Sequence, residues 1–338
     1  MDFIAREIQR EYQLRRDKAL KDLEIRREEI YNLIPRIKEI DSEIFFLGLE
    51  SGRLVLQGDD AEKESVILSK KMELLKEEKF SLLRQHKLED DYLLPRYICS
   101  KCEDRGYLKV DDNWIKCTCY NQELIIMSSQ EKTLFTTLDE ENFSTFDETL
   151  FSDEIPSASK ISTRDNILRV KARSLEFLEN LENPKGKNLL FYGLTGLGKT
   201  FMCNCIAKEA LERGFTVVYH RAFSLFELIR NYNFNPEKSN MTKEYFDLIY
   251  SCDLLILDDL WFENPSPFNL EQLFNILNIR LSRGKKILIS TNHSLSELNE
   301  KYSSRIYSRI IDNFFPCRFI GTDLRLQKKL NRIKKNTP

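Results

Sequence analysis

The sequence predicts a mixed α/β fold class, and three observations support this prediction. From about residue 161 onward, strands of nearly continuous apolar residues alternate with helical segments, which is typical of a parallel sheet covered on both faces. A glycine-rich loop of the phosphate-binding type follows the first of these strands. Upstream lie a charged segment with helical spacing of apolar residues and a compact group of four cysteines. We therefore expect a P-loop parallel-sheet core preceded by an α-helical hairpin and a small cysteine knuckle.

Length and composition restrict the class of protein. A chain of 338 residues is long enough for two domains, and its net charge of −2 means that any nucleic-acid contact must come from local basic patches. The N-terminus lacks the apolar core of a signal peptide, and no apolar run reaches the ~20 residues of a membrane helix. We therefore expect a cytoplasmic protein without a membrane partner, in a reducing compartment where clustered cysteines favour metal binding over disulfides.

The sequence divides into four predicted parts. These are a charged α-helical partner-binding arm at residues 1–92, a four-cysteine zinc knuckle at 93–122, a linker at 123–157 and a nucleotide-binding domain at 158–338. The linker is polar and acidic. We expect it to contact the following domain through its aromatic residues Phe143, Phe146 and Phe151.

The arm has apolar residues at heptad-like spacing from residue 23 to residue 47 and again from 66 to 82. Gly52 and Gly58 separate the two runs. Two helices with a glycine-bearing connection predict an antiparallel hairpin. Its narrow apolar seam fits internal packing and docking of a partner equally well.

The nucleotide-binding domain is predicted to alternate between strands and helices. Strands are expected at 188–192, 215–220, 253–259, 286–292 and 318–323. Helices are expected at 161–183, from the phosphate loop to 213–214, at 222–232 and at 269–283.

The phosphate loop, GLTGLGKT at residues 193–200, matches G-x4-G-K-[ST] in full and lies between a predicted strand and a helix. Glycines let backbone N–H groups turn toward the phosphates, and the helix N-terminus adds its positive end. Lys199 is expected to reach the β- and γ-phosphates, and the Thr200 hydroxyl to ligate Mg²⁺. The predicted nucleotide-binding residues are Gly193, Thr195, Gly196, Gly198, Lys199, Thr200 and Phe201.

Two aspartates end the apolar strand at 253–259. Asp258 would bring a carboxylate oxygen to Mg²⁺ beside the phosphate loop. Asp259 follows where many such ATPases place a glutamate that polarises the attacking water, and its shorter side chain leaves the hydrolysis rate open. The alternative is a turn-initiating Asp-Asp pair after a strand.

Three further positions are candidates for sensing the γ-phosphate. Asn292 ends the next strand, where its amide could hydrogen-bond the γ-phosphate or the attacking water, although alone it would indicate only a turn. Arg305 and Arg309 share one predicted helical face and could project toward a neighbour's γ-phosphate, the alternative being a solvated basic face. Arg325 is a third candidate cation.

Four cysteines form a C-x2-C pair and a C-x-C pair separated by a short segment. They are Cys99, Cys102, Cys117 and Cys119. Four thiolates without an acidic or histidine ligand predict a closed structural Zn²⁺ site. Gly106, Tyr107 and Trp114 lie between the pairs and fit a short hairpin packed over the metal. The alternatives are unrelated reduced cysteines and a redox switch.

Five motifs, GLTGLGKT, LLILDDL, LISTN, RIYSRI and FIGTDLR, follow one another along the chain. In this order and spacing they resemble the DnaC/DnaI-type helicase loaders and the related IstB transposition ATPases, which are AAA+ proteins. The resemblance covers about residues 140–326 and includes the linker sequence ENFSTFDETLFSD. It implies an AAA+ ATPase core that binds ATP at subunit interfaces and hydrolyses it slowly under control of partners.

The resemblance also implies roles for individual residues. Asp258 matches the Walker B metal ligand, Asp259 the catalytic carboxylate and Asn292 sensor 1. Arg309 matches the arginine finger and Arg325 the sensor 2 position. The implied catalytic residues are Lys199, Asp258, Asp259, Asn292 and Arg309. Aspartate at position 259 departs from the commoner Asp-Glu pair of AAA+ proteins, which puts the hydrolysis rate in doubt and not nucleotide binding.

By resemblance, the chain is an ATP-dependent loader that binds a replicative DnaB-type helicase through its N-terminal part and delivers it to single-stranded DNA. DNA contacts are predicted in an insert where Arg221, Arg230, Lys238 and Lys243 lie among aromatics, the alternative being an ordinary surface helix. Rival functions are an IstB-like transposition helper ATPase, which the long arm with its cysteines disfavours, and an adaptor that binds ATP without hydrolysing it.

Overall fold

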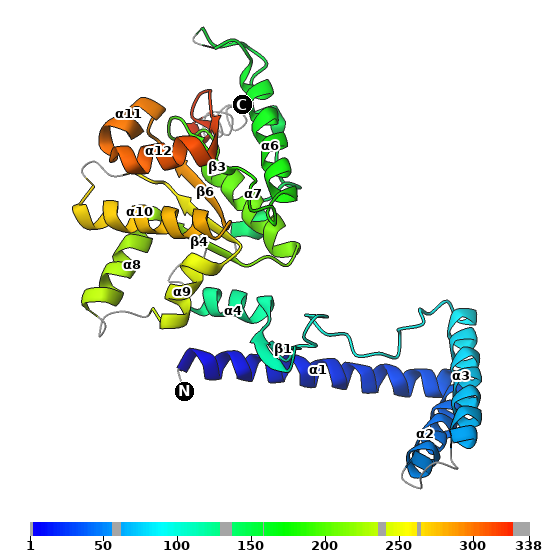
Figure 1. Ribbon diagram of the computed structural model, residues 1–338. Helices are drawn as coiled ribbons and strands as arrows, with labels where there is room; N and C mark the ends of the chain where they lie inside the picture. The colour runs from blue at the N-terminus through cyan, green and yellow to red at the C-terminus, as the bar shows by residue number, and fades with distance from the viewer. Residues whose placement is uncertain are drawn as a thin grey trace. The chain divides into compact units, whose positions relative to one another are not determined.

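The computed structural model describes residues 3–55, 62–128, 137–157, 159–235, 241–261 and 265–326 (Figure 1). The chain forms two compact units. One consists of residues 9–115, and the other of residues 116–338 together with the first eight residues. Among the described residues, no helix is long and apolar enough to cross a membrane.

The unit of residues 116–338 is built on a five-stranded parallel sheet with the strand order β4-β5-β6-β3-β7. The strands are β3 (Asn188–Tyr192), β4 (Val217–Arg221), β5 (Leu254–Asp258), β6 (Lys286–Thr291) and β7 (Phe314–Arg318). The register pairs Tyr192 with Thr291 and Arg221 with Asp258. The carboxyl ends of these strands therefore meet at one edge of the sheet, where the predicted nucleotide-binding residues also lie.

Helices cover both faces of this sheet, which confirms the predicted α/β class (Figure 1). They are α6 (Thr163–Glu179), α7 (Lys199–Glu212), α8 (Ala222–Phe234), α9 (Lys243–Ser251), α10 (Pro267–Ser282), α11 (Leu295–Lys301) and α12 (Ser304–Asn313). Leu189 and Phe191 of β3 pack with α6 and α7 in one apolar cluster. Leu190, which points to the opposite face, is equally buried.

The segment that precedes α6 packs on the unit of residues 116–338. Phe151 belongs to the apolar cluster of α6 and α7, and Phe143 and Phe146 pack against it, as predicted. The segment also contains η2 (Glu148–Leu150) and the helix α4 (Thr118–Ser128), which the prediction of a plain linker omitted. The Gln122 side chain of α4 accepts from Val217 N–H at 2.8 Å and donates to the Val217 carbonyl at 3.3 Å.

The last strand lies earlier than the prediction of 318–323, because β7 spans Phe314–Arg318. β7 contains Pro316, which has no N–H to donate to a neighbouring strand. β7 is an edge strand that pairs only with β3 among the described strands, and proline is tolerated at edges. Residues 319–323 instead leave the sheet toward the phosphate loop, where Leu324 N–H donates to the Gly196 carbonyl at 3.0 Å.

The other unit contains α2 (Pro35–Val55), α3 (Glu62–Gln85) and most of α1 (Phe3–Leu33). α2 and α3 form the predicted hairpin. The first apolar run is not one helix, however, because Pro35 lacks an N–H and restricts Ile34, so α1 ends there. Gly52 lies inside α2 and not in the connection, and Gly58 lies outside the described residues.

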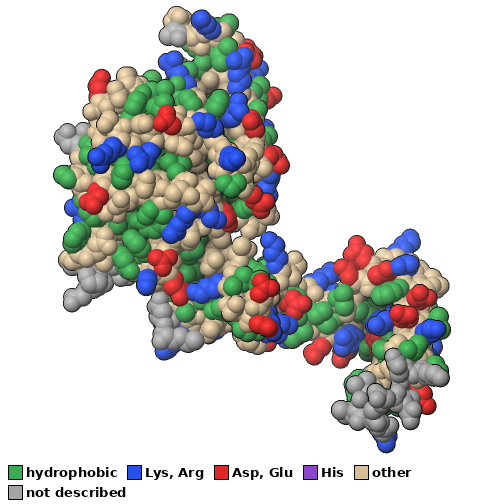
Figure 2. All heavy atoms as spheres, in the orientation of Figure 1, with side chains coloured by type: hydrophobic (Ala, Val, Ile, Leu, Met, Phe, Trp, Pro, Cys, Tyr) green, Lys and Arg blue, Asp and Glu red, His purple; other side chains and the backbone are tan. Residues whose placement is uncertain are grey.

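The hairpin is held by an apolar seam and by ion pairs across it. Ile40 and Leu47 of α2 pack against Leu75 of α3. The Arg36 guanidinium binds both oxygens of Glu78 at 2.8 and 3.2 Å. These contacts support internal packing of part of the seam, although Figure 2 and the exposed fractions show apolar side chains at the surface of both helices as well.

Candidate functional site

The phosphate loop joins β3 to α7 along the backbone path that its glycines predict. Gly193, Gly196 and Gly198 have φ angles of +139°, +81° and +93°, a region that residues with side chains rarely adopt. α7 begins at Lys199 directly after this loop, so its first N–H groups have no partner within the helix. Such a helix N-terminus is a binding site for phosphate.

Close packing on the loop also requires glycine. A Cβ on Gly196 would lie 2.3 Å from the carboxyl carbon of Asp323, and one on Gly193 would lie 2.5 Å from the Phe319 carbonyl oxygen. Residues 319–324 therefore lie directly against the phosphate loop.

Lys199 lies at the centre of the site and is 7% exposed. Its Nζ donates to the carbonyl oxygens of Gly193 and Leu194, each at 2.7 Å, and to Asn292 Oδ1 at 2.8 Å. Burial lowers the pKa of its ammonium group, and the nearby Asp259 carboxylate opposes this shift. Lys199 thus links the phosphate loop to the end of β6.

Asp258 is buried at the end of β5 and receives three hydroxyl donors. Its Oδ2 accepts from Thr200 Oγ1 at 3.0 Å and from the Tyr219 hydroxyl at 3.1 Å. Its Oδ1 accepts from the Ser290 hydroxyl. The sequence did not single out these two partners: Tyr219 lies in no motif, Ser290 lies in the motif LISTN without a role assigned to it, and only the strand register places them beside Asp258.

Asp259 is held by β6 through both its backbone and its side chain. Its N–H donates to Ser290 Oγ at 2.9 Å, and its Oδ1 accepts from Asn292 Nδ2 at 2.8 Å. Its φ angle of +53° lies in the left-handed region, which aspartate and asparagine enter more readily than most residues. Backbone strain of this kind is concentrated at functional sites.

The oxygen atoms at this edge suit Mg²⁺. Thr200 and Asp258 supply hydroxyl and carboxylate oxygens, the ligands that this hard cation prefers. The Thr200 oxygen can bind a metal through a lone pair while its own proton is donated in the hydrogen bond to Asp258 Oδ2. The residues present therefore fit an Mg²⁺-bound triphosphate along the loop.

A pocket of about 950 Å³ adjoins the phosphate loop. Its walls come mainly from residues 150–163, 192–197 and 318–324, and Phe151, Leu197 and Phe319 make it largely apolar. Its size is within the range of small-molecule sites, so it can hold the base and ribose of a nucleotide. Apart from the phosphate loop itself, this wall could not be predicted from the sequence, because residues 150–163 and 318–324 lie far from the loop along the chain.

The predicted arginines lie in two different places. Arg309 is directed at α10, where its guanidinium donates to Asn278 Oδ1 at 3.0 Å and lies 4.4 Å from the centre of the Phe274 ring. Arg305, one turn earlier, is exposed. Among the described residues, the Arg309 side chain bonds to Asn278 and to the Arg305 carbonyl, and not to the group around Lys199.

Arg325 lies closer to the phosphate loop. Its backbone N–H donates to Asp323 Oδ1 at 2.8 Å, and its charge contributes to lowering the pKa of Lys199. Thr195 is exposed in the loop. The Phe201 side chain packs on the core with its ring 6.2 Å from that of Phe146, so its backbone is the part available to a nucleotide.

The insert predicted to bind DNA is described except for residues 236–240, which include Lys238. Arg230 of α8 lies over the Phe268 ring at 5.0 Å, and Phe234 meets the same ring edge-on. Phe223 and Phe234 are exposed at the surface of α8. Exposed rings next to a cation are the arrangement that unpaired bases stack on.

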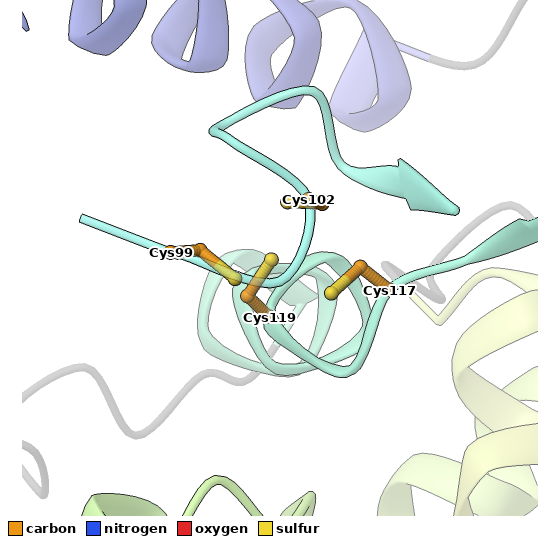
Figure 3. A group of neighbouring side chains, drawn as sticks. All are labelled: Cys99, Cys102, Cys117 and Cys119. Carbon is orange, nitrogen blue, oxygen red and sulfur yellow. The ribbon is translucent and has the colours of Figure 1, made fainter. Parts of the chain in front are cut away.

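The four clustered cysteines converge as predicted. Their sulfur atoms all lie within 4.8 Å of one another, and Figure 3 shows them pointing toward a common centre. Four sulfurs at about 2.3 Å from a tetrahedral Zn²⁺ would be about 3.8 Å apart, so the cluster is compatible with zinc. The remaining cysteines, Cys203, Cys205, Cys252 and Cys317, are buried.

The loop that carries the first cysteine pair is shaped by Asp104. Its buried carboxylate accepts from the N–H groups of Ile98 and Cys99, each at 2.9 Å. The predicted hairpin is present as β1 (Tyr107–Val110) and β2 (Asn113–Lys116). Trp114 was expected in a hairpin packed over the metal, but it is 64% exposed and is not covered there.

The sequence profile of the IstB-like ATP binding protein matches residues 160–328, which is half of the chain. The chain belongs to the IstB-like ATP-binding family. Membership places its core among the AAA+ ATPases, as the sheet order and the phosphate loop indicate.

Two kinds of known protein are similar to this member of the IstB-like family. The chromosomal replication initiator protein DnaA of Wolinella succinogenes is 27% identical over 166 residues, which are 47% of this chain and 36% of the relative. DnaA of Aliarcobacter butzleri is 31% identical over 122 residues, 36% of this chain and 26% of the relative. The chain thus spans well under half of these relatives. The solved DnaC helicase loader aligns with 20% identity and a TM-score of 0.43 over 54% of this chain and 99% of its own.

Proposed function

We propose that this protein is an ATP-dependent loader that binds a replicative DnaB-type helicase and delivers it to single-stranded DNA. The observation that carries the ATPase part is the bonded group of Lys199, Thr200, Asp258, Asp259 and Asn292 in an ATP-binding family. The ordered motifs that resemble helicase loaders support the loading role. The DnaA relatives, whose name marks them as replication initiators, agree with a role in replication.

The site residues have distinct tasks in this proposal. Bound Mg²⁺ would neutralise phosphate charge. Lys199 and the N–H groups at the start of α7 bind the β- and γ-phosphates, and Thr200 and Asp258 hold the metal. Asp259 accepts a hydrogen bond from the attacking water and orients it, while Asn292 fixes the position of Asp259. ATP binding and slow hydrolysis then switch the protein between two states.

The arm supplies the surface for the helicase. α2 is rich in charge, yet Phe45, Phe46 and Leu49 on it are between 57% and 67% exposed. Val66, Ile67 and Leu74 of α3 are also exposed. Large exposed apolar groups on a charged helical hairpin are typical of a surface that another protein covers. We assign the helicase contact to these exposed apolar side chains, which the hairpin itself leaves uncovered.

The cysteine cluster acts as a structural Zn²⁺ site between the arm and the ATPase core in the sequence. No histidine or carboxylate belongs to the cluster in the described part of the chain, and Cys102 and Cys117 are buried. A closed site of this type stabilises a small fold and does not catalyse. Self-association would bring Arg309 to the γ-phosphate of a neighbouring copy, where its charge stabilises the transition state.

Capture of the host's purified replicative helicase tests the loading role. The full-length protein should retain the helicase on a column in the presence of ATP, and a Phe45→Ser/Phe46→Ser variant should lose at least 10-fold in affinity because two exposed anchors are removed. Leu14→Ser on α1 is the matched control, since Leu14 is also exposed. Retention of a transposase and not of the helicase would instead support the IstB-like transposition helper.

Single-turnover hydrolysis, with and without single-stranded DNA, tests the ATPase role separately. We expect slow turnover that changes when DNA is present. The helix α8, which carries the predicted DNA contact, directly follows β4, and β4 lies next to β5, the strand that carries Asp258. Turnover at background level in both conditions, with intact ATP binding, would leave only an ATP-binding adaptor.

A further inference from the structure

Tyr219 and Ser290 hold the Asp258 carboxylate from its two sides. Tyr219 lies on β4 and Ser290 on β6, the two neighbours of β5. The phenol donates to Oδ2 at 3.1 Å, and the serine hydroxyl donates to Oδ1. Tyr219 is 5% and Ser290 1% exposed, so water does not compete freely for these bonds.

The strand register explains why these two residues meet Asp258. Leu257 pairs with Ile289, so the next residues, Asp258 and Ser290, lie side by side on the same face. Tyr219 pairs with Ile256, two residues before Asp258. An aromatic side chain is long enough to reach such a diagonal neighbour. The contact is therefore built into the sheet.

Ser290 serves both aspartates at once. While it donates to Asp258, its oxygen accepts from Asp259 N–H at 2.9 Å. The serine thus fixes the left-handed backbone of Asp259, and this backbone directs the Asp259 carboxylate to Asn292. One hydroxyl sets the position of the metal-binding carboxylate and of the carboxylate next to the attacking water.

The acceptor positions of Asp258 are nearly filled by these contacts. A carboxylate has about four acceptor positions, and Thr200, Tyr219 and Ser290 occupy three of them. The carboxylate can therefore turn little, and one position remains for the metal or a water bound to it. A buried tyrosine that served packing alone would need a hydrogen-bond partner for its hydroxyl. That partner would not have to be the Asp258 carboxylate.

We propose that Tyr219 and Ser290 are positioning residues of the magnesium site, which hold Asp258 in the orientation that binds Mg²⁺–nucleotide. The proposal rests on the proposed role of Asp258 as a metal ligand. Partners that orient metal ligands typically contribute 10- to 100-fold to metal affinity, so loss of either hydroxyl should weaken metal binding without removing the phosphate loop.

The test measures the Mg²⁺ dependence of nucleotide binding and not turnover. The full-length protein is mixed with a fluorescent, non-hydrolysable ATP analogue in EDTA, and Mg²⁺ is then titrated. Tyr219→Phe and Ser290→Ala should each raise the half-maximal Mg²⁺ concentration about 10-fold or more. Affinity for the analogue in EDTA should stay within about threefold of wild type, because the phosphate loop is unchanged.

Matched variants separate positioning from packing. Ser290→Thr keeps the hydroxyl and should restore the Mg²⁺ dependence to within about threefold of wild type. Tyr245→Phe removes another buried phenol, whose partner is His220, and Ser174→Ala removes another buried hydroxyl, bonded to Val170. Both controls should titrate as wild type does.

Asp258→Asn distinguishes failure of this inference from failure of the proposed metal site. If Asp258→Asn shifts the titration while Tyr219→Phe and Ser290→Ala stay within twofold of wild type, Asp258 binds the metal without help and the inference is overturned. If Asp258→Asn also titrates as wild type, the metal site itself is wrongly assigned, and the positioning role falls with it.

Discussion

The amide oxygen of Asn292 accepts a hydrogen bond from Lys199 Nζ at 2.8 Å, which joins the end of β6 to the phosphate loop. The amide nitrogen of the same residue donates to Asp259 Oδ1 at 2.8 Å. One side chain therefore contacts the lysine that binds phosphate and the carboxylate next to the attacking water. A phosphate that draws Lys199 toward itself would also change the contact that fixes Asp259.

Asn292→Ala should lower kcat by roughly 100-fold, the usual effect of losing one positioned donor at the reacting centre. The Kd for ATP should change less than about threefold, because the phosphate loop and Thr200 are unaffected. Single-turnover hydrolysis and a fluorescent-nucleotide titration measure the two quantities. An unchanged kcat would show that the amide does not act in the reaction.

Asp259→Asn should strongly reduce hydrolysis and leave ATP binding intact. Asparagine is also tolerated at the φ of +53° found here, so this variant removes the charge with little backbone strain. We expect a loss of at least roughly 100-fold in turnover at saturating ATP. Asp259→Ala is a weaker test because it also strains the backbone, and wild-type turnover in Asp259→Asn would exclude Asp259 as the group that orients the water.

Much of this site could be predicted because its residues lie in local motifs. The strand, glycine loop and helix around Lys199 are adjacent in the sequence, Asp258 ends β5, and Asn292 directly follows β6. The carboxyl ends of parallel strands lie at one edge of the sheet, so the side chains at these ends come together once the fold is predicted correctly. The four cysteines were predictable for the same reason, since they lie within one short segment.

What the sequence did not indicate depends on contacts between distant segments. Tyr219 and Ser290 become recognisable only when the order β4-β5-β6 is known. A strand that contains Pro316 is expected only at the edge of a sheet, and the edge position of β7 could not be inferred from the sequence. Trp114 was expected to be covered, but it and its neighbour Ile115, which point to opposite faces of the hairpin, are both exposed. The alternation of side chains along a strand does not tell which face, if either, another part of the protein covers.

Gly196→Ala should abolish nucleotide binding. The added Cβ would lie 2.3 Å from the Asp323 carboxyl carbon, and φ of +81° is unfavourable for alanine. Gly52→Ala is the matched control, because nothing lies within 4 Å of its Cβ and it lies inside α2. That change should stabilise the helix by about 0.5–1 kcal/mol. Fluorescent-nucleotide titration and urea unfolding separate these effects, and normal binding by Gly196→Ala would contradict the loop geometry.

The purified protein should contain about one zinc per chain, since four thiolates complete one tetrahedral site. Cys102→Ser should reduce the zinc content to near zero and leave ATP binding unchanged, because Cys102 takes no part in the phosphate site. Cys205→Ala, a buried cysteine outside the cluster, is the control. Zinc release after thiol modification gives the count, and full zinc content in Cys102→Ser would exclude the cluster as the metal site.

The core should lose stability as the pH falls from about 6.5 toward 4, because His220 is buried in β4 against Tyr245. Burial lowers the pKa of His220 to about 4. Between pH 6.5, the ordinary pKa of histidine, and pH 4, the unfolded chain binds a proton that the folded protein does not bind. Unfolding therefore becomes more favourable as the pH falls. At pH 5 the free energy of unfolding should be lower by about 2 kcal/mol than at pH 7.

Urea unfolding of wild type and His220→Gln at both pH values isolates the effect, because other groups titrate equally in the two proteins. We expect the wild type to lose about 2 kcal/mol more than the variant, and equal losses would show that His220 is protonated in the folded protein.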